Sequence, residues 1–321
     1  MKLAIAIVLA LVVVASAESA YPDWAYEAFD HWCAEWDKTY DSPSEKEFRV
    51  GVFYANMKNI EETNAAQDSY RLGPNGFTDL TTEEFLQLHT GLLPMNIEES
   101  DEEIVEVTGY ADSVDWVTKG AVTGVKNQGE CGACWSFSAT GALEGIEFII
   151  KGHLISLSEQ ELIDCSQKFN NYGCKGGSPD NAFSYVEQLG ITTEAYYPYT
   201  AKQGSCKYSS ASVVVKSSKH RDLLKRSESA FLSALDTQPI SISIDADQIM
   251  SYTSGIYNNA NCGTTVNHAA LAVGYDTSAG YIKVKNSWGT TWGESGYIRF
   301  ALLGNGSGEC GIYLQSSLPI I

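Results

Sequence analysis

Basic residues are scarce in this 321-residue sequence, most of all in its first third. The whole chain has 21 Lys and Arg residues against 40 Asp and Glu, which gives a formal net charge of −19 at pH 7. Residues 18–109 contain only 5 of the basic residues but 21 of the acidic ones. This balance argues against nucleic acid as a partner. It also indicates a segment boundary near residue 110, directly after the acidic run IEESDEEIVEV.

A second long apolar run is also lacking, and the one that exists lies at the N-terminus. Lys2 precedes an unbroken apolar stretch that ends in the small-residue triplet Ala15-Ser16-Ala17. This arrangement predicts a secretory signal peptide over residues 1–17. A membrane-spanning helix is the alternative, but the run is short for that role. We therefore expect no membrane association after signal removal, and a location in the secretory pathway, with a lysosome, a vacuole or the extracellular space as destination.

Residues 18–109 have helical patterns. Ser42-Pro43-Ser44-Glu45 predicts a capping box with proline at the first helical position. In the helix that follows, side chains spaced by three or four positions form one stripe that mixes charged, aromatic and amide groups. Such a stripe indicates a polar network against another helix, although a plain core-facing stripe has the same spacing. Its members are Glu45, Arg49, Phe53, Asn56, Ile60 and Asn64. Thr81-x-x-Glu84 predicts the start of a further short helix.

Beyond residue 110 the pattern changes from helix to strand. A helix is predicted from Cys134 to Lys151, with Leu143, Ile146 and Ile150 on one face and Gly152 as its stop. Ser158-x-x-Glu161 predicts the start of another. After about residue 215 the segments PISISIDA, GYIKVKNSWG and GYIRFAL alternate as strands do. We expect an α+β arrangement, a helical half followed by a sheet-rich half with a cleft between them.

One cysteine and one of the few histidines suggest nucleophilic chemistry. A cysteine at a helix N-terminus, as predicted for Cys134, has its thiolate stabilised by the helix dipole, and a histidine partner lowers its pKa further. His268 is one of five histidines and lies among small apolar residues, although a core or surface histidine is the commoner reading of such a pattern. Asn286 can orient an imidazole that Trp288 and Trp292 shield from water, but its motif is also that of a strand-ending turn.

Taken together, the motifs resemble the papain and cathepsin family of cysteine proteases, in order and spacing. They are QGECGACWSFSATGALEG, LSEQELIDCS, GCKGG, VNHAALAVGY and KNSWGTTWGESGYIRF. The resemblance implies a papain-like fold of two subdomains, a helical left half and a β-barrel-like right half. It implies that Cys134 is the nucleophile, His268 its base and later acid, Asn286 the orienting residue, and Gln128 an oxyanion donor beside the N–H of Cys134. No cofactor or metal is implied.

The first third resembles the propeptides of cathepsin L-like enzymes. The stripe from Glu45 to Asn64 matches their helix signature, and Gly73-x-Asn75-x-Phe77-x-Asp79 matches their second motif. The resemblance implies a small helical prodomain, residues 18–109, that inhibits the mature peptidase domain, residues 110–321. A helical spacer is the alternative. The mature chain would begin near Tyr110 or Ala111.

The same resemblance implies which residues bind the substrate and which form disulfides. The substrate-binding positions are Gly176, Gly177, Ser178, Pro179, Val266, Ala269, Gln315 and Trp292. The implied disulfides are Cys131–Cys174, Cys165–Cys206 and Cys262–Cys310, leaving Cys33 and Cys134 free. A redox role for Cys131 and Cys134 is disfavoured because a bond between them would consume the nucleophile, and zinc because no second ligand pair lies nearby.

Several expectations follow for activity and partners. No long insertion separates Cys165 from Cys206, which favours endopeptidase over dipeptidase activity. The resemblance implies a pocket for the residue two before the cleaved bond, and its apolar walls favour a hydrophobic side chain there, while the neutral Gln315 lacks the carboxylate that would favour arginine. Expected partners are protein and peptide substrates, the chain's own propeptide and cystatin-type inhibitors, with the enzyme a monomer. The acidic run suggests activation at acid pH, although it can equally be a solvated linker. A catalytically silent binder, or a propeptide that acts as a free inhibitor, are the other functions considered.

Overall fold

The computed structural model describes residues 19–94 and 109–321; the predicted signal peptide and the acidic run lie outside these ranges. The helices are α1 (Asp23–Glu35), α2 (Pro43–Ala66), α3 (Thr82–His89), α4 (Cys134–Lys151), α5 (Glu159–Cys165), α6 (Pro179–Leu189) and α7 (Glu228–Leu235). The strands are β1 (Tyr70–Leu72), β2 (Ser113–Asp115), β3 (Lys219–Asp222), β4 (Ile240–Ile244), β5 (Tyr252–Tyr257), β6 (His268–Asp276), β7 (Tyr281–Lys285), β8 (Tyr297–Ala301) and β9 (Ser316–Ile320). Within the two described ranges, no helix is both long and apolar enough to span a membrane.

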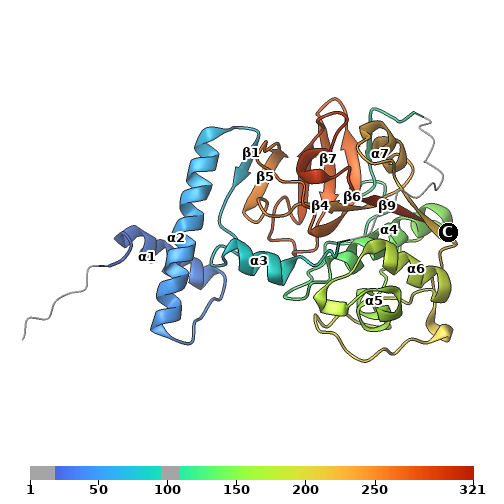
Figure 1. Ribbon diagram of the computed structural model, residues 1–321, viewed down its shortest axis with the longest axis horizontal. Helices are drawn as coiled ribbons and strands as arrows, with labels where there is room; N and C mark the ends of the chain where they lie inside the picture. The colour runs from blue at the N-terminus through green and yellow to red at the C-terminus, as the bar shows by residue number, and fades with distance from the viewer. Residues whose placement is uncertain (1–18, 95–108) are drawn as a thin grey trace, which may run out of the picture.

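The α+β arrangement with two halves is confirmed. Figure 1 shows α4, α5 and α6 below the sheet and α1 and α2 at the far end of the molecule, with α3 between. The strands follow the order β1-β5-β8-β7-β6-β4-β9-β3, and β2 pairs with β6. One hydrophobic cluster fills the sheet half and a second surrounds α4 in the helical half. The long strand β6 contributes to both, so the two halves meet along it.

Helix α4 is the central helix of the C-terminal segment, residues 109–321. It begins at Cys134 and ends at Lys151, and the Gly152 that caps it has a φ of 79°, the left-handed conformation that glycine adopts without strain. The prediction of one apolar face is wrong in part: Ile150 is 50% exposed, whereas Leu143 is fully buried. The helix is enclosed on nearly all sides from Cys134 to Glu147, so its core-facing surface is not a stripe.

The sheet half differs from the predicted alternation at β4. All five residues of this strand are buried, because β6 and β9 flank it and α4 covers its serine face. The hydroxyl of Ser241 donates to the carbonyl of Ser138 on α4 at 3.1 Å, which satisfies the polar group in the core. Helix α7, a short helix within the strand-rich half, was not predicted from the sequence.

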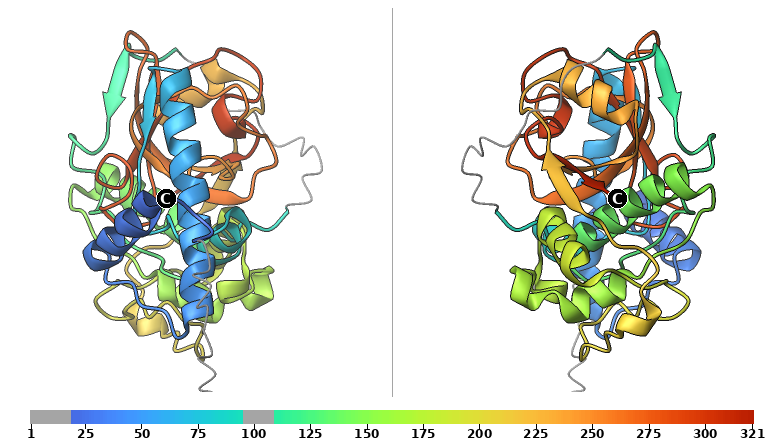
Figure 2. Two further views of the ribbon diagram at one scale, coloured as in Figure 1. Left: turned by 90° about the vertical axis from the view of Figure 1, so that its left-hand side faces the viewer. Right: turned by 90° about the vertical axis from the view of Figure 1, so that its right-hand side faces the viewer.

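Residues 19–94, the N-terminal segment, contain α1, α2, β1 and α3, and the first two helices share a core of their own. Phe29 and Trp32 of α1 pack against Val50 and Phe53 of α2. Figure 2 shows the long helix α2 standing across one end of the molecule. The predicted capping box of α2 forms only by half: the Ser42 hydroxyl accepts from the N–H of Glu45, while the Glu45 carboxylate pairs with Arg49 instead.

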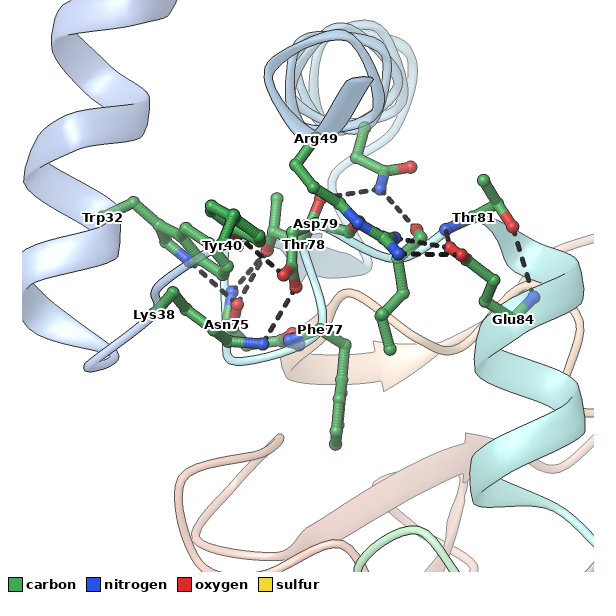
Figure 3. Close-up of polar contacts among 12 residues, drawn as sticks. Trp32, Lys38, Tyr40, Arg49, Asn75, Phe77, Thr78, Asp79, Thr81 and Glu84 are labelled. Atoms are coloured by element: carbon green, nitrogen blue, oxygen red, sulfur yellow. Dashed lines mark hydrogen bonds and ion pairs between the residues drawn. The ribbon is translucent and has the colours of Figure 1, made fainter. Parts of the chain in front are cut away.

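The stripe on α2 makes the predicted polar network, mostly with a loop rather than a helix (Figure 3). Arg49 binds both carboxylate oxygens of Glu84 at 2.7 and 3.0 Å and the carbonyl of Asp79 at 2.9 Å. Asn56 donates to the carbonyls of Thr78 and Leu80. Among these partners only Glu84 belongs to a helix, α3, where it completes a full capping box with Thr81.

The N-terminal segment is joined to the sheet by strand pairing and by aromatic contacts. Strand β1 pairs antiparallel with β5 and thereby extends the sheet at its edge. Phe85 of α3 lies in the core of the sheet half, its ring 4.9 Å from that of Trp288. The amide of Asn75 donates to the carbonyl of Met250. The N-terminal segment therefore shares a hydrophobic core with the C-terminal segment, which a spacer would not do.

Candidate active site

Cys134 is the first residue of α4 and is fully buried. Its sulfur accepts a hydrogen bond from the N–H of Ala269 at 3.4 Å, and the N–H groups of Cys134 and Trp135 also point at it. These donors favour the thiolate, as expected for a helix N-terminus. In this structure, however, burial outweighs them and raises the pKa of the Cys134 thiol to about 12. The depressed pKa expected from the sequence is therefore not a property of the closed form.

His268 begins β6, and Asn286 follows β7 directly. The Nε2 of His268 donates to the Oδ1 of Asn286 at 2.8 Å, and the ring of Trp288 lies 4.6 Å from the imidazole. This bond leaves Nδ1 of His268 buried without a hydrogen-bond partner among the described residues. Burial lowers the pKa of His268 to about 4, so the imidazole is neutral at pH 7.

Gln128 is held rigidly in the loop before α4. Its Oε1 accepts from the hydroxyl of Ser287 at 2.6 Å, and its Nε2 donates to the carbonyl of Cys131 at 2.9 Å. An amide nitrogen has two N–H groups, so Nε2 retains one donor beyond this bond. The structure thus brings the loop that carries Gln128 next to the one that carries Asn286, since Ser287 belongs to the latter.

The N-terminal segment covers this group of residues with its own backbone. The N–H of Gly177 donates to the carbonyl of Gly91, and the N–H of Leu93 donates to the carbonyl of Gly177, both at 3.0 Å. The bridge between Leu92 and Gly177 is parallel. A side chain on Gly91, whose φ is 154°, would place a Cβ 2.7 Å from the Cα of Gly132. Only glycine allows so close an approach to the loop before Cys134.

The predicted substrate-binding residues fall into three groups. Pro179 and Gln315 line one small cavity of about 20 Å³, together with Asp180 and Ser243, which the sequence analysis missed. Ser178 is buried and caps α6, and Gly176 has a φ of 115°. The remaining residues lie nearer the cysteine or behind it: Val266 is half-buried, Ala269 donates to Cys134, and Trp292 packs behind Trp288 with its N–H on the carbonyl of Met250.

A buried cluster of charges lies behind the same residues and was not predicted. Lys126 pairs with Glu159 at 2.6 Å and with Glu144 at 3.3 Å. Lys285, the residue before Asn286, donates to the hydroxyl of Thr123 at 3.0 Å. Burial raises the pKa of Glu159 to about 7. No spacing in the sequence indicates this cluster, because its members come from four separate segments.

Three disulfides hold the loops around the candidate site. They are Cys131–Cys174, Cys165–Cys206 and Cys262–Cys310, the pairs that the resemblance implies. Cys33 and Cys134 are free. The first of these bonds joins the loop before Cys134 to the loop before Gly177, so it fixes the two walls between which residues 91–93 lie.

Two family models match the chain, each over one of its segments. The model of the papain family of cysteine proteases matches residues 110–320. The chain belongs to the papain family of cysteine proteases. The model of the cathepsin propeptide inhibitor domain matches residues 29–85, which lie in the N-terminal segment.

Relatives from several sources support this membership. Chymopapain from Carica papaya is 43% identical over 305 residues, which is 91% of this chain and 86% of that protein. A recombinant stem bromelain precursor has a TM-score of 0.84 at 38% identity, over 93% of this chain and 99% of the other. A digestive procathepsin L 3 of the Tenebrio molitor larval midgut has a TM-score of 0.80 at 37% identity, over 94% and 100% of the two chains.

The protein is therefore a papain-family cysteine protease joined to a cathepsin-type inhibitory propeptide. Its fold matches precursors in which the propeptide is still attached, such as the bromelain precursor and the procathepsin. The family membership and the propeptide predicted from the sequence are confirmed. Covered by residues 91–93, the protease has the form of a zymogen that becomes active when the propeptide is removed.

Proposed function

We propose that Cys134, His268, Asn286 and Gln128 carry out peptide-bond hydrolysis in the roles that the resemblance implies. The observation that supports this most is the pair of Cys134, at the N-terminus of α4, and His268, held by Asn286 with its Nδ1 left free. The Cys134 thiolate attacks the peptide carbonyl carbon, forming a thioester and breaking the C–N bond. His268 protonates the departing amine and then accepts a proton from the water that hydrolyses the thioester.

The oxyanion that forms during the attack needs fixed donors. The backbone N–H of Cys134 at the first turn of α4 and the remaining N–H of Gln128 are the donors we assign to it. Gln128 is suited to the role because Ser287 and the carbonyl of Cys131 fix its amide before any substrate binds. A fixed donor does not have to reorganise in the transition state.

We also propose that the attached propeptide keeps this pair in its uncharged form. Burial raises the pKa of Cys134 to about 12 and lowers that of His268 to about 4, so neither group is charged at pH 7. Release of residues 91–93 readmits water to the site, and the helix N-terminus and the imidazole then favour the thiolate. We further propose that acid pH triggers removal of the propeptide and that the mature chain begins near Tyr110 or Ala111.

For substrates we propose endopeptidase activity with a hydrophobic residue two positions before the cleaved bond. The pocket formed by Pro179 and Gln315 supports this choice, since Gln315 is neutral. Asp180 in the same cavity is the group that would favour a basic residue, and burial raises the pKa of its carboxyl to about 6. A peptide-library profile dominated by arginine at this position would contradict the proposal and assign the pocket's selectivity to Asp180.

We infer the cellular setting from the predicted signal peptide and from the disulfides. We propose a monomeric enzyme of the secretory pathway, resident in a lysosome or vacuole or released outside the cell, and inhibited by cystatin-type proteins. The three disulfides support an oxidising route of synthesis. A silent binding protein is disfavoured because all four proposed catalytic side chains are present in the sequence and His268 is hydrogen-bonded to Asn286.

The test is hydrolysis of a fluorogenic Phe-Arg peptide after acid treatment of the full chain. We expect activity to appear together with loss of the N-terminal segment and to titrate one-to-one with an epoxide inhibitor of thiol proteases. The Cys134→Ala variant is the control and is expected to be inactive. A processed and folded wild-type chain without activity would overturn the proposed catalytic roles and favour the binding function.

A further inference from the structure

The side chain of His89 occupies a site on the C-terminal segment that the proposed catalytic steps do not use. Its Nδ1 lies 3.1 Å from the carbonyl oxygen of Gly129, and its own carbonyl accepts from the indole N–H of Trp288 at 2.9 Å. Phe77 and Phe85 pack against the imidazole at centroid distances of 4.6 and 5.5 Å. All three of these aromatic or imidazole rings leave with the N-terminal segment, which opens the surface next to Gly129 and Trp288.

The position of this surface relative to the scissile bond follows from His268. The proposed mechanism has His268 protonate the departing amine, and the imidazole of His268 lies against Trp288 at 4.6 Å. The N-terminal segment passes Trp288 at His89 and reaches Gly177, beyond Cys134, at Leu92. The surface under His89 is therefore on the leaving-group side of the cleaved bond, opposite the side of Gly177.

The charge next to this surface comes from Glu130. This residue is exposed, follows Gly129 directly, and its carboxylate acts to raise the pKa of His89. Lys38, on the N-terminal segment, acts in the opposite direction, as does burial, which is the largest effect. When the segment leaves, Lys38 leaves with it, and the carboxylate of Glu130 remains beside the surface that His89 covered.

We propose that Glu130, the carbonyl of Gly129 and the indole of Trp288 form a subsite for a cationic side chain on the leaving-group side of the substrate. Lysine, arginine and protonated histidine each fit this chemistry, because they offer an N–H donor to the carbonyl and a positive charge to the carboxylate. Their apolar stems can lie along the indole. The inference rests on the proposed protease function and gives it a specificity determinant.

The test compares internally quenched peptides that differ only at the first or second residue after the cleaved bond, with Lys, Gln or Glu there. We expect the processed wild-type enzyme to cleave them with kcat/KM in the order Lys, Gln, Glu. Because Glu130 is exposed, Glu130→Gln should lower the Lys-to-Glu ratio by about two- to fivefold. Added salt should lower the wild-type ratio toward that of the variant.

Asp112→Asn is the matched control, since it removes the same charge from an exposed residue. Ser113, its neighbour, pairs with Asp276 at the end of β6, whereas His268 begins that strand, so about 25 Å separates Asp112 from the site. A ratio that is unchanged in Glu130→Gln, or changed equally in Asp112→Asn, would overturn the subsite while normal cleavage of the Gln peptide upheld the protease function. Failure to cleave any peptide would instead overturn that function, and this inference with it.

Discussion

The N-terminal segment uses one kind of contact to hold itself together and another to hold the enzyme closed. Internally it relies on carboxylate pairs, such as Arg49 with Glu84 and Lys38 with Asp79, above an aromatic core. Against the enzyme it uses a ring contact between Phe85 and Trp288, a strand pairing and a neutral histidine. The two sets of contacts respond to different ranges of pH.

The internal pairs persist into stronger acid than the interface does. Arg49 lowers the pKa of Glu84, so the stability that this pair contributes is present above the ordinary value of 4.5 and is lost only as the pH falls through the lowered pKa. Burial lowers the pKa of His89 below its ordinary value of 6.5. The released His89 then binds a proton that the closed form excludes, so the contact of the N-terminal segment with the enzyme weakens as the pH falls below about 6.5. We therefore predict that mild acid opens the interface before it unfolds the segment.

The largest effect on the interface is expected from Phe85→Ala. The ring is fully buried and packs on Trp288, so its removal should weaken closure by about 3–4 kcal/mol, which corresponds to roughly a hundredfold or more in the open population. The measurement is the rate of Cys134 alkylation in the unprocessed chain at pH 7, read by peptide mass mapping to separate it from Cys33. Gln87→Ala, at an exposed position of the same helix, is the control; equal rates in the two variants would contradict the assignment.

Arg49→Met tests the internal contacts and should have the next largest effect. It removes the guanidinium from Glu84, which keeps only the N–H of Thr81, and leaves the carbonyl of Asp79 without a donor, at an expected cost of about 2–3 kcal/mol of segment stability. The measurement is thermal unfolding of the full chain, with each substitution made in a Cys134→Ala background. Lys46→Met, which breaks an exposed pair with Asp30, should change stability by less than about 1 kcal/mol. A similar loss in both variants would show that the Arg49 network contributes no more than a surface pair.

Gly91→Ala should open the interface by steric conflict. The added Cβ meets the backbone of Gly132, which cannot move as a side chain can, and overpacking of this kind costs about 1–3 kcal/mol. Faster alkylation of Cys134 at pH 7 is the expected result. Gly124→Ala is the control, because an added Cβ there meets open space. An alkylation rate of Cys134 in Gly91→Ala equal to that of the wild type would contradict the close approach of Gly91 to Gly132.

The smallest change is expected from His89→Gln at pH 7, and its effect should appear in the pH profile. Glutamine can keep a donor to Gly129 but does not titrate, so closure should lose less strength between pH 6.5 and 5 than in the wild type. The readout is the alkylation rate of Cys134 across this range. Parallel profiles for the two proteins would exclude His89 as a contributor and leave the pH response to His268 and the carboxylates.

Local signals in the sequence predicted much of this structure. Ser42-Pro43 gave the start of α2, and Gly152 gave the end of α4, because caps depend on neighbouring residues alone. The proposal that Cys134, His268 and Asn286 act together was based on sequence motifs and on the family resemblance. The full burial of β4 could not be predicted, since it depends on which elements cover each face.

Contacts between distant segments account for what the sequence analysis missed. The charge cluster of Lys126 and Glu159 joins residues 33 positions apart, and His89 meets Gly129 across 40 positions. None of these four residues belongs to a sequence pattern that indicates its partner. The pKa of Cys134 was missed for a related reason: the helix N-terminus is a local feature, whereas the burial that outweighs it depends on how distant parts of the chain pack around the thiol.

The most direct test of the account is the alkylation rate of Cys134 by iodoacetamide in the intact, unprocessed chain as the pH is lowered from 7 to 5. We predict a rate at pH 7 at least about a hundredfold below that of the processed enzyme, and a rise on acidification, with mass spectrometry showing the chain uncut. An ordinary exposed thiol would react more slowly as the pH falls, because its thiolate fraction decreases. Alkylation at pH 7 as fast as in the processed enzyme would contradict the claim that the N-terminal segment closes the site.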